Sequence, residues 1–213
     1  MARTTGRQWL ALAALCIAAF GGGVLLRQAG PVGTDLTGRL DLAAFAPDPA
    51  APADGPADAA VILQVFTDYQ CGPCRAGHPA MLAAAERAGD VRIVYRDLPR
   101  LGPLSERAAR VALAAHAQGL YTPVHNALMR ERRQLDEPVL REIVERAGGD
   151  WQRVQRDLAA DRRIDARLTA NATDAMRLGV PGTPAYLAGP YRVVGMLSER
   201  DFARLFQQAR EAN

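Results

Sequence analysis

The pattern of apolar and polar residues divides the chain into three parts. Residues 9–26, "WLALAALCIAAFGGGVLL", form a run of 18 uncharged residues. Residues 27–58 mix Pro, Ala, Asp and Gly without periodicity, and this composition favours an extended, poorly packed linker. From residue 59 onward, short apolar runs alternate with amphipathic stretches. We therefore predict one folded domain over residues 59–213, preceded by a linker and an apolar N-terminal segment.

Within the domain, the apolar runs predict a mixed α/β fold. "AVILQVF" (60–66) and "VRIVYRDL" (91–98) are short and rich in branched residues, as in buried strands. "PAYLAGPYRVVG" (184–195) alternates about a turn and predicts a hairpin. A helix is expected from about Cys71 to Ala88, a helical section over about 103–178, and a last helix from Ser198, where Asp201 completes a pattern similar to a capping box. The order strand, helix, strand, helices, strand, strand, helix predicts an α/β sandwich with a helical insertion.

The N-terminal run carries positive charges at its ends. Arg3 and Arg7 precede it and Arg27 follows it. The run is longer than the ~7–15 residues of a typical signal-peptide core and close to the ~20 residues of a spanning helix. Because the preceding charges stay inside, an anchor and a cleaved signal both send the rest of the chain across the membrane. We expect residues 1–26 to form an uncleaved anchor, with a cleaved signal segment as the alternative.

Charge and composition exclude some functions. All 26 basic residues are arginines, which excludes Schiff-base and lysine-nucleophile chemistry. The net charge is only +3, and the arginines alternate with Asp and Glu, which is typical of solvated helix faces. No basic patch is interleaved with aromatic residues, so we expect no nucleic-acid binding.

Two cysteines three positions apart are the candidate chemistry. A thiolate is the reactive form of cysteine, and the first turn of a helix stabilises one at Cys71. Pro73 fits such a turn, because its missing N–H has no partner there anyway. Cys74 follows one turn later, close enough to close a disulfide. The spacing predicts an exposed, activated sulfur at Cys71 and a more buried resolving thiol at Cys74.

Three other interpretations of the pair stay open at this point. A zinc site would need two further ligands, for which His78, His116 and His125 are available. A purely structural disulfide across three positions would constrain little of the chain. The pair could also be a vestige on a domain that only binds.

Several segments resemble a known superfamily. "CGPCRAGHP", with Pro79 eight residues after the first cysteine, resembles the active site of thioredoxins, and "VFTDYQCGPC" resembles the corresponding stretch of DsbA, DsbC and DsbG. "GVPGTPAY" (179–186) resembles the cis-proline loop, which makes Thr183–Pro184 the candidate cis bond. "ERAARVALAAHAQGLYTPVHNALM" is similar to the helical domain of DsbA-like proteins. The resemblance covers about residues 59–210.

The resemblance implies a DsbA-like thiol–disulfide oxidoreductase with a thioredoxin fold and an inserted helical subdomain. Cys71 and Cys74 would form the catalytic, redox-active disulfide, and Thr183 and Pro184 would bind the substrate. No metal or organic cofactor is implied. The implied partners are protein thiols or disulfides and a membrane redox protein. The implied location is the periplasmic face of the bacterial inner membrane, or the soluble periplasm if the segment is cleaved.

The direction of electron flow is open, although an isomerase ranks last because residues 27–58 are short for a dimerisation domain. The alternative function is a tethered binding module or metal-holding domain without redox turnover.

The sequence also departs from the family pattern near the cysteines. Val65 occupies the position where thioredoxins have a buried Asp and DsbA has a Glu, so no carboxylate at that position can take the proton of Cys74. Asp68 either influences the thiolate or, as we expect, shapes the turn. His78 either tunes Cys74 or is a polar residue of the helix face. Tyr69 and Tyr186 either border a substrate groove or, as we expect, belong to the core.

Overall fold

The computed structural model describes residues 9, 15–16 and 30–212. The chain divides into two units, residues 1–31 and 32–213. In the first unit, Trp9, Leu15 and Cys16 are helical and exposed. The predicted anchor or signal at residues 1–26 falls almost entirely outside the described residues. Within the described ranges, no helix combines the length and the apolar character that a membrane crossing needs.

The second unit is built on a six-stranded sheet with the order β1-β6-β5-β3-β4-β2. Its strands are β1 (Thr34–Asp35), β2 (Ala53–Asp54), β3 (Val61–Thr67), β4 (Val91–Asp97), β5 (Ala185–Ala188) and β6 (Tyr191–Val194). β3 and β4 pair in parallel, and every other neighbouring pair is antiparallel. The two predicted central strands and the predicted hairpin are confirmed, the hairpin as β5 and β6.

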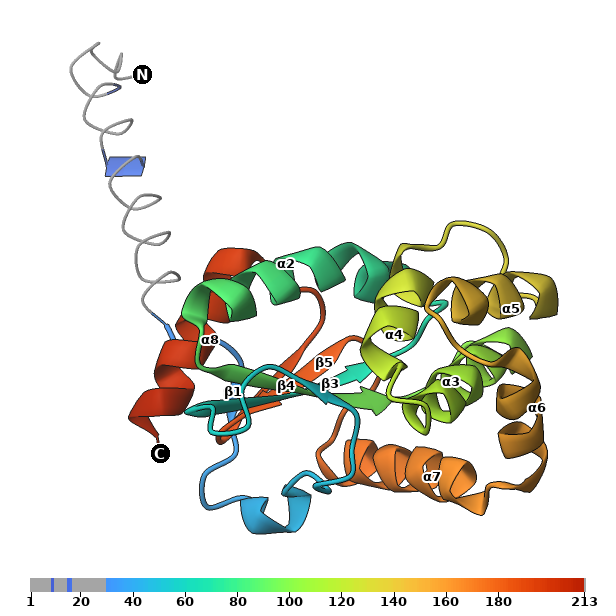
Figure 1. Cartoon of the computed structure of the whole chain (residues 1–213). Helices are drawn as coiled ribbons and strands as arrows, with labels where there is room; N and C mark the ends of the chain where they lie inside the picture. The colour runs from blue at the N-terminus through green and yellow to red at the C-terminus, as the bar shows by residue number, and fades with distance from the viewer. Residues whose placement is uncertain (1–8, 10–14, 17–29, 213) are drawn as a thin grey trace. The chain divides into compact units, whose positions relative to one another are not determined.

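Helices cover both faces of this sheet and one end of it (Figure 1). α2 (Gly72–Ala88) and α8 (Glu199–Glu211) lie together on one face. The insertion consists of α3 (Pro103–His116), α4 (Tyr121–Arg130), α5 (Glu137–Arg146), α6 (Trp151–Ala160) and α7 (Arg162–Arg177). α3 to α6 gather at one end, and α7 packs against β4 from the other face (Figure 1). The predicted α/β fold with a helical insertion is confirmed.

Local signals fix where two of these helices begin and end. Ser198 is the N-cap of α8, and its Oγ accepts a hydrogen bond from the Asp201 N–H at 3.2 Å, as the capping pattern predicts. α2 ends at Gly89, whose φ of +73° is a conformation that glycine adopts without a Cβ clash.

The sheet separates two apolar clusters. Val61, Leu63 and Val65 alternate along β3 and pack into the larger cluster under α2 and α8. Phe66 points to the other face and joins the smaller cluster with Leu187. The cysteines therefore begin a helix that rests on the larger core.

Residues 32–58, which we name the N-terminal strap, correct the linker prediction. Val32, Leu36 and Phe45 are buried, and the Gln64 Nε2 donates a hydrogen bond to the Phe45 carbonyl at 2.9 Å. β1 pairs with β6 at one edge of the sheet, and β2 pairs with β4 at the other. Strands of two residues are too short to show an alternating pattern in the sequence. Their extended conformation is set by the sheet edges with which they pair. Residues 32–58 are therefore part of the fold.

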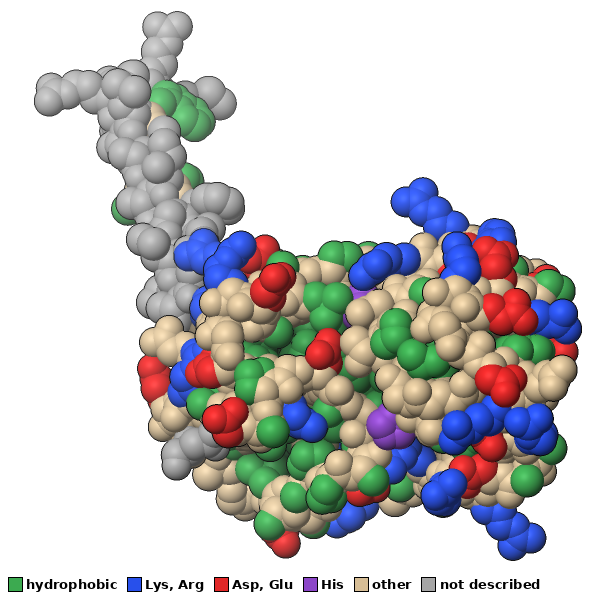
Figure 2. Space-filling view, viewed as in Figure 1, with side chains coloured by type: hydrophobic (Ala, Val, Ile, Leu, Met, Phe, Trp, Pro, Cys, Tyr) green, Lys and Arg blue, Asp and Glu red, His purple; other side chains and the backbone are tan. Residues whose placement is uncertain are grey.

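The surface of the second unit mixes both signs of charge. Figure 2 shows blue and red side chains interspersed over this face. Arg133, for example, pairs with Glu131 at 2.7 Å and with Glu142 at 2.8 Å. Exposed pairs of this kind contribute little to stability. This mixing agrees with the prediction of solvated, charge-alternating helix faces.

Candidate functional site

The two cysteines lie at the start of α2, as predicted. Cys71 is the N-cap, and its Sγ accepts a hydrogen bond from the Cys74 N–H at 3.2 Å. Pro73 lies in the first turn. The backbone N–H groups of the first turn and the positive end of the helix dipole therefore point toward this sulfur. Both thiols are free in this structure.

The prediction that Cys71 is exposed is wrong. Its relative exposure is 5%, close to the 3% of Cys74. The loop that carries Thr183 covers it, and the Cys71 Sγ lies 3.3 Å from the Thr183 carbonyl oxygen. The Thr183 loop therefore limits access to this sulfur.

The Thr183–Pro184 peptide bond is cis, as the loop sequence predicts. The Pro184 carbonyl accepts a hydrogen bond from the Gly195 N–H at 2.8 Å, which ties the loop to the end of β6. The two contacts of Thr183 divide between the sulfurs. Its carbonyl faces Cys71, whereas its side chain acts on Cys74, whose pKa it lowers.

The two thiols are not equivalent. Burial, with a hydrogen bond to Cys71, raises the pKa of Cys74 to about 12, although hydrogen bonds from the Thr183 side chain and the Asp68 backbone act in the opposite direction. Cys74 therefore keeps its proton near neutral pH while Cys71 sits at the helix N-terminus. This asymmetry suits a nucleophile and a resolving thiol.

Asp68 is a turn residue, as expected, but it does more than cap its own turn. Its carboxylate accepts hydrogen bonds from the backbone N–H of Gln70 at 2.8 Å and of Arg100 at 2.6 Å, and from the Ser105 hydroxyl. It is 1% exposed. The carboxylate thus joins the cysteine turn to the beginning of α3.

Two other residues from the sequence lie in the interior. Tyr69 and Tyr186 are 1% and 2% exposed, so both belong to the core, as expected. Burial is the main cause that raises the pKa of Tyr186. The nearby sulfurs of Cys74 and Cys71 raise it further.

His78 is buried, and its Nε2 lies 2.8 Å from the Asn126 Oδ1. Burial lowers its pKa, so the imidazole is neutral near pH 7. Over the described part of the chain, no group of three or more His, Cys, Asp or Glu side chains is arranged to hold a metal ion.

Sequence reasoning missed a buried polar cluster under the cysteine turn. The Tyr69 hydroxyl lies 2.8 Å from the His125 Nδ1 and 3.4 Å from the Tyr121 hydroxyl. The Tyr121 hydroxyl in turn donates to both carboxylate oxygens of Asp97, at 3.0 and 2.9 Å. Burial raises the pKa of Asp97 to about 7. The one available signal was the spacing of Tyr121 and His125, which places both on one face of a helix.

With this geometry in place, comparison with known proteins identifies the family. The family described as "DSBA-like thioredoxin domain" matches residues 62–207, which is more than half of the chain. The chain belongs to this family. The prediction of a DsbA-like thiol–disulfide oxidoreductase with a thioredoxin fold is confirmed at the level of the family.

Individual relatives agree with the family. The DSBA-like domain is 33% identical to a thioredoxin-like oxidoreductase from Silicibacter pomeroyi, with a TM-score of 0.75 over 78% of this chain and 95% of that one. A periplasmic thioredoxin-like protein from Salmonella enterica serovar Typhimurium is 25% identical, with a TM-score of 0.72 over 79% and 95% of the two chains.

A curated relative is the Na(+)/H(+) antiporter NhaA 3 of Salinispora tropica, 31% identical over 147 residues. The match takes in 65% of this chain but 22% of the antiporter, so the chain spans about a fifth of that relative's length.

At position 65, this DSBA-like domain has a valine in place of the buried Asp that thioredoxins have there, as the sequence indicated. Val65 is 3% exposed and packs in the larger core. Two buried carboxylates lie near the C-terminal end of β3: Asp68 in the cysteine turn, and Asp97 on β4, which pairs in register with Thr67. The Asp97 carboxylate is engaged by the Tyr121 hydroxyl of the insertion, whereas the Asp68 carboxylate is engaged by the entrance to α3.

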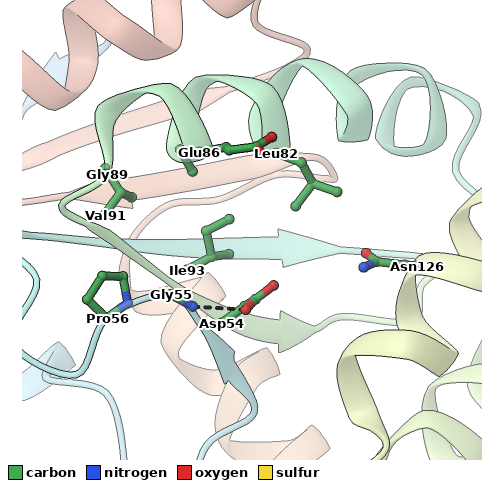
Figure 3. A pocket seen from close by; sticks show the side chains of 10 residues that line it. Asp54, Gly55, Pro56, Leu82, Glu86, Gly89, Val91, Ile93 and Asn126 are labelled. Atoms are coloured by element: carbon green, nitrogen blue, oxygen red, sulfur yellow. Dashed lines mark hydrogen bonds between the residues drawn. The ribbon is translucent and has the colours of Figure 1, made fainter.

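A cavity of about 330 Å³ lies between α2 and β4. Figure 3 shows Leu82 and Ile93 facing it from α2 and β4, with Glu86 and Asp54 at its rim and Asn126 at one end. Neither cysteine lines it.

Proposed function

We propose that this chain is an extracytoplasmic thiol–disulfide oxidoreductase that exchanges disulfides with protein substrates through Cys71 and Cys74. One observation carries the proposal. The Cys71 Sγ is held 3.2 Å from the Cys74 N–H at a helix N-terminus and 3.3 Å from the carbonyl of the residue before a cis proline. This places a nucleophile, a resolving thiol and a backbone acceptor for a substrate chain within one small surface.

The reaction in the reducing direction has two steps. The Cys71 thiolate attacks one sulfur of a substrate disulfide, and the other substrate sulfur leaves as a thiolate. Cys74, once deprotonated, attacks the Cys71 sulfur of the mixed disulfide and releases the second substrate thiolate. The protein loses two electrons and two thiol protons and ends with a Cys71–Cys74 disulfide, whereas the substrate gains both. The oxidising direction is the reverse, and neither direction needs a metal or an organic cofactor.

Thr183 and Pro184 are the proposed substrate-binding residues. The Thr183 side chain hydrogen-bonds Cys74 and lowers its pKa against the effect of burial, which favours the thiolate that forms in the resolving step. The backbone at Gly182 and Thr183, which is partly exposed, would pair with an extended substrate segment. A protein substrate fits this surface better than a small molecule, because Cys71 does not lie in the cavity described above.

The proposed location is the periplasmic face of the inner membrane, with residues 1–26 as anchor, or the soluble periplasm if that segment is removed. The apolar N-terminal run supports export, and the likeness to a periplasmic protein of Salmonella supports the compartment. Protein disulfides persist in such a space. A membrane protein would then exchange electrons with the cysteine pair after each turnover.

A trapping experiment tests the proposal. With Cys16 replaced by Ser, the Cys74→Ser variant should accumulate mixed disulfides with substrate proteins through Cys71, and Cys71→Ser should accumulate none. A binding module without turnover would keep its function in Cys74→Ser and trap nothing. Zinc near one equivalent in the reduced, purified protein would favour a metal-holding domain instead.

The reduction potential would then give the direction. A value near about −120 mV indicates a donor of disulfides, and a value near about −270 mV indicates a reductase. If the pair forms no disulfide at all, the proposal fails.

A further inference from the structure

Two side chains hold the turn that leads into Cys71, and both attach it to the helical insertion or its entrance. On one side, the Asp68 carboxylate accepts hydrogen bonds from the N–H groups of Arg100 and Leu101, at 2.6 and 3.2 Å, and from the Ser105 hydroxyl in the first turn of α3. Inside the turn, the Cys71 N–H donates to the Asp68 carbonyl at 3.1 Å. The position of Asp68 therefore fixes the direction from which the chain reaches Cys71.

On the other side, Tyr69 reaches α4. Its hydroxyl lies 2.8 Å from the His125 Nδ1 and 3.4 Å from the Tyr121 hydroxyl, and all three residues are at most 3% exposed. Burial keeps the pKa of His125 well below its ordinary value, so its imidazole is neutral and Nδ1 can accept the Tyr69 proton. Because Tyr121 donates its own proton to Asp97, its oxygen can act as a second, more distant acceptor for the single Tyr69 proton, which His125 holds at the shorter distance.

Packing alone does not require these contacts. A phenylalanine ring would fill the site of Tyr69 equally well, and a buried hydroxyl carries a desolvation cost unless it is hydrogen-bonded. Tyr69 lies two positions before Cys71 in the sequence, so a shift of its side chain can move the turn that carries Cys71. Reaction rates are sensitive to displacements of the reacting atom of about 1 Å. The hydrogen bonds of Tyr69 therefore connect the position of α4 to the position of the Cys71 sulfur.

We propose that Tyr121 and His125 are positioning residues for thiol–disulfide exchange, and that they act through the Tyr69 hydroxyl on the turn that presents Cys71. The helical insertion then takes part in the reaction by holding the nucleophile in place. The inference rests on the proposed function of the cysteine pair. Both residues hydrogen-bond within the buried cluster, to Tyr69 and Asp97, rather than to Cys71.

The same cluster supplies a matched control. The Tyr95 ring lies 4.3 Å from that of His125, and Tyr95 is as buried as Tyr69. Within the described residues its hydroxyl has no hydrogen-bond partner. Tyr95→Phe and Tyr69→Phe therefore remove the same atom from the same cluster, but only Tyr69→Phe removes hydrogen bonds that reach the cysteine turn.

The experiment compares the reduced 213-residue protein and these two variants, each with Cys16 replaced by Ser so that only the Cys71–Cys74 pair reacts. The rate of mixed-disulfide formation with oxidised glutathione is measured at 20 °C, and the equilibrium constant of the pair is measured in glutathione buffers. Circular dichroism confirms that each variant is folded under these conditions. We expect Tyr69→Phe to slow the reaction about tenfold and to shift the equilibrium constant at least threefold, because one or two buried hydrogen bonds are lost. Tyr95→Phe should stay within about twofold of the wild type in both measurements.

A second pair of variants covers the case in which Tyr69→Phe does not fold. His125→Asn keeps an acceptor oxygen near the position of Nδ1, and His125→Phe keeps a ring without an acceptor. The proposal expects His125→Asn to react several-fold faster than His125→Phe.

Equal rates for Tyr69→Phe and Tyr95→Phe, or for the two His125 variants, would overturn the inference and leave the proposed function intact. A wild-type protein that does not react with oxidised glutathione would overturn the proposed function, and the inference with it.

Discussion

Replacing Asp97 by Asn should make the stability of the protein much less dependent on pH. Asp97 is 1% exposed, and burial raises its pKa from 3.8 to about 7 despite hydrogen bonds from Tyr121 and Tyr69, which lower it. The folded chain therefore binds this proton more tightly than the unfolded chain does. The stability that this provides is complete below about pH 4 and is lost as the pH rises through about 7.

The size of the effect follows from the two pKa values. A change from 3.8 to about 7 corresponds to about 4 kcal/mol at about 1.4 kcal/mol for each tenfold change in proton affinity. Most of the loss falls between pH 5 and pH 8, where it amounts to roughly 3 kcal/mol. For a protein with a urea dependence of about 2 kcal/mol per molar, the unfolding midpoint would move by roughly 1.5 M.

Urea unfolding at pH 5 and pH 8 measures this directly. The quantity of interest is the difference in unfolding free energy between the wild type and Asp97→Asn at each pH. His78 and His125, whose pKa values burial lowers, change stability with pH in the opposite sense, but both are present in both proteins and cancel. The amide introduced by Asp97→Asn would keep one oxygen as an acceptor for Tyr121, so the fold should persist.

The expected result is that the variant gains roughly 3 kcal/mol relative to the wild type between pH 5 and pH 8. Asp58→Asn, which changes an exposed carboxylate, serves as control and should follow the wild type at both pH values. If Asp97→Asn also follows the wild type, Asp97 does not bind its proton in this pH range, and the reasoning from burial is refuted.

Three further predictions concern single contacts. Thr183→Val removes the hydrogen bond to Cys74, so the pKa of Cys74 should rise further and the mixed disulfide should live about three- to tenfold longer at pH 7; an unchanged lifetime in quenched-flow samples would contradict this. Phe45→Ala empties a position that is 2% exposed and should lower the unfolding free energy by about 3–5 kcal/mol in urea titrations; a loss below about 1 kcal/mol would mean that the strap does not contribute to the core. Ser198→Ala removes the N-cap of α8 and should cost about 1 kcal/mol, whereas Ser198→Asp, which keeps an acceptor, should cost much less; equal losses would argue against capping.

The cysteine turn shows what local sequence can predict. The position of Cys71 at a helix start follows from Pro73 and the apolar face beyond it, and the cis bond at Pro184 follows from a loop whose sequence is distinctive. The central strands were predictable because each is a run of seven residues with buried side chains at most positions. These features are set by neighbours in the sequence.

The parts that the sequence did not reveal depend on distant partners. His125 lies 56 positions from Tyr69, and nothing in either segment indicates that they meet. The burial of Cys71 comes from a loop 112 positions away. The strap has isolated apolar residues among Pro, Ala and Asp. These residues show no pattern of their own, because they are buried by the edges and the face of a sheet that is formed by other parts of the chain.

The strap also has a consequence for any shortened form of the protein. Both outermost strands of the sheet, β1 and β2, come from this one segment. A protein that began at residue 59 would leave the backbone N–H and C=O groups of β4 and β6 unpaired, and such edges are templates for pairing with other chains. We expect that form to self-associate, which sedimentation would detect, so the solubility of the domain depends on residues whose composition is that of a spacer.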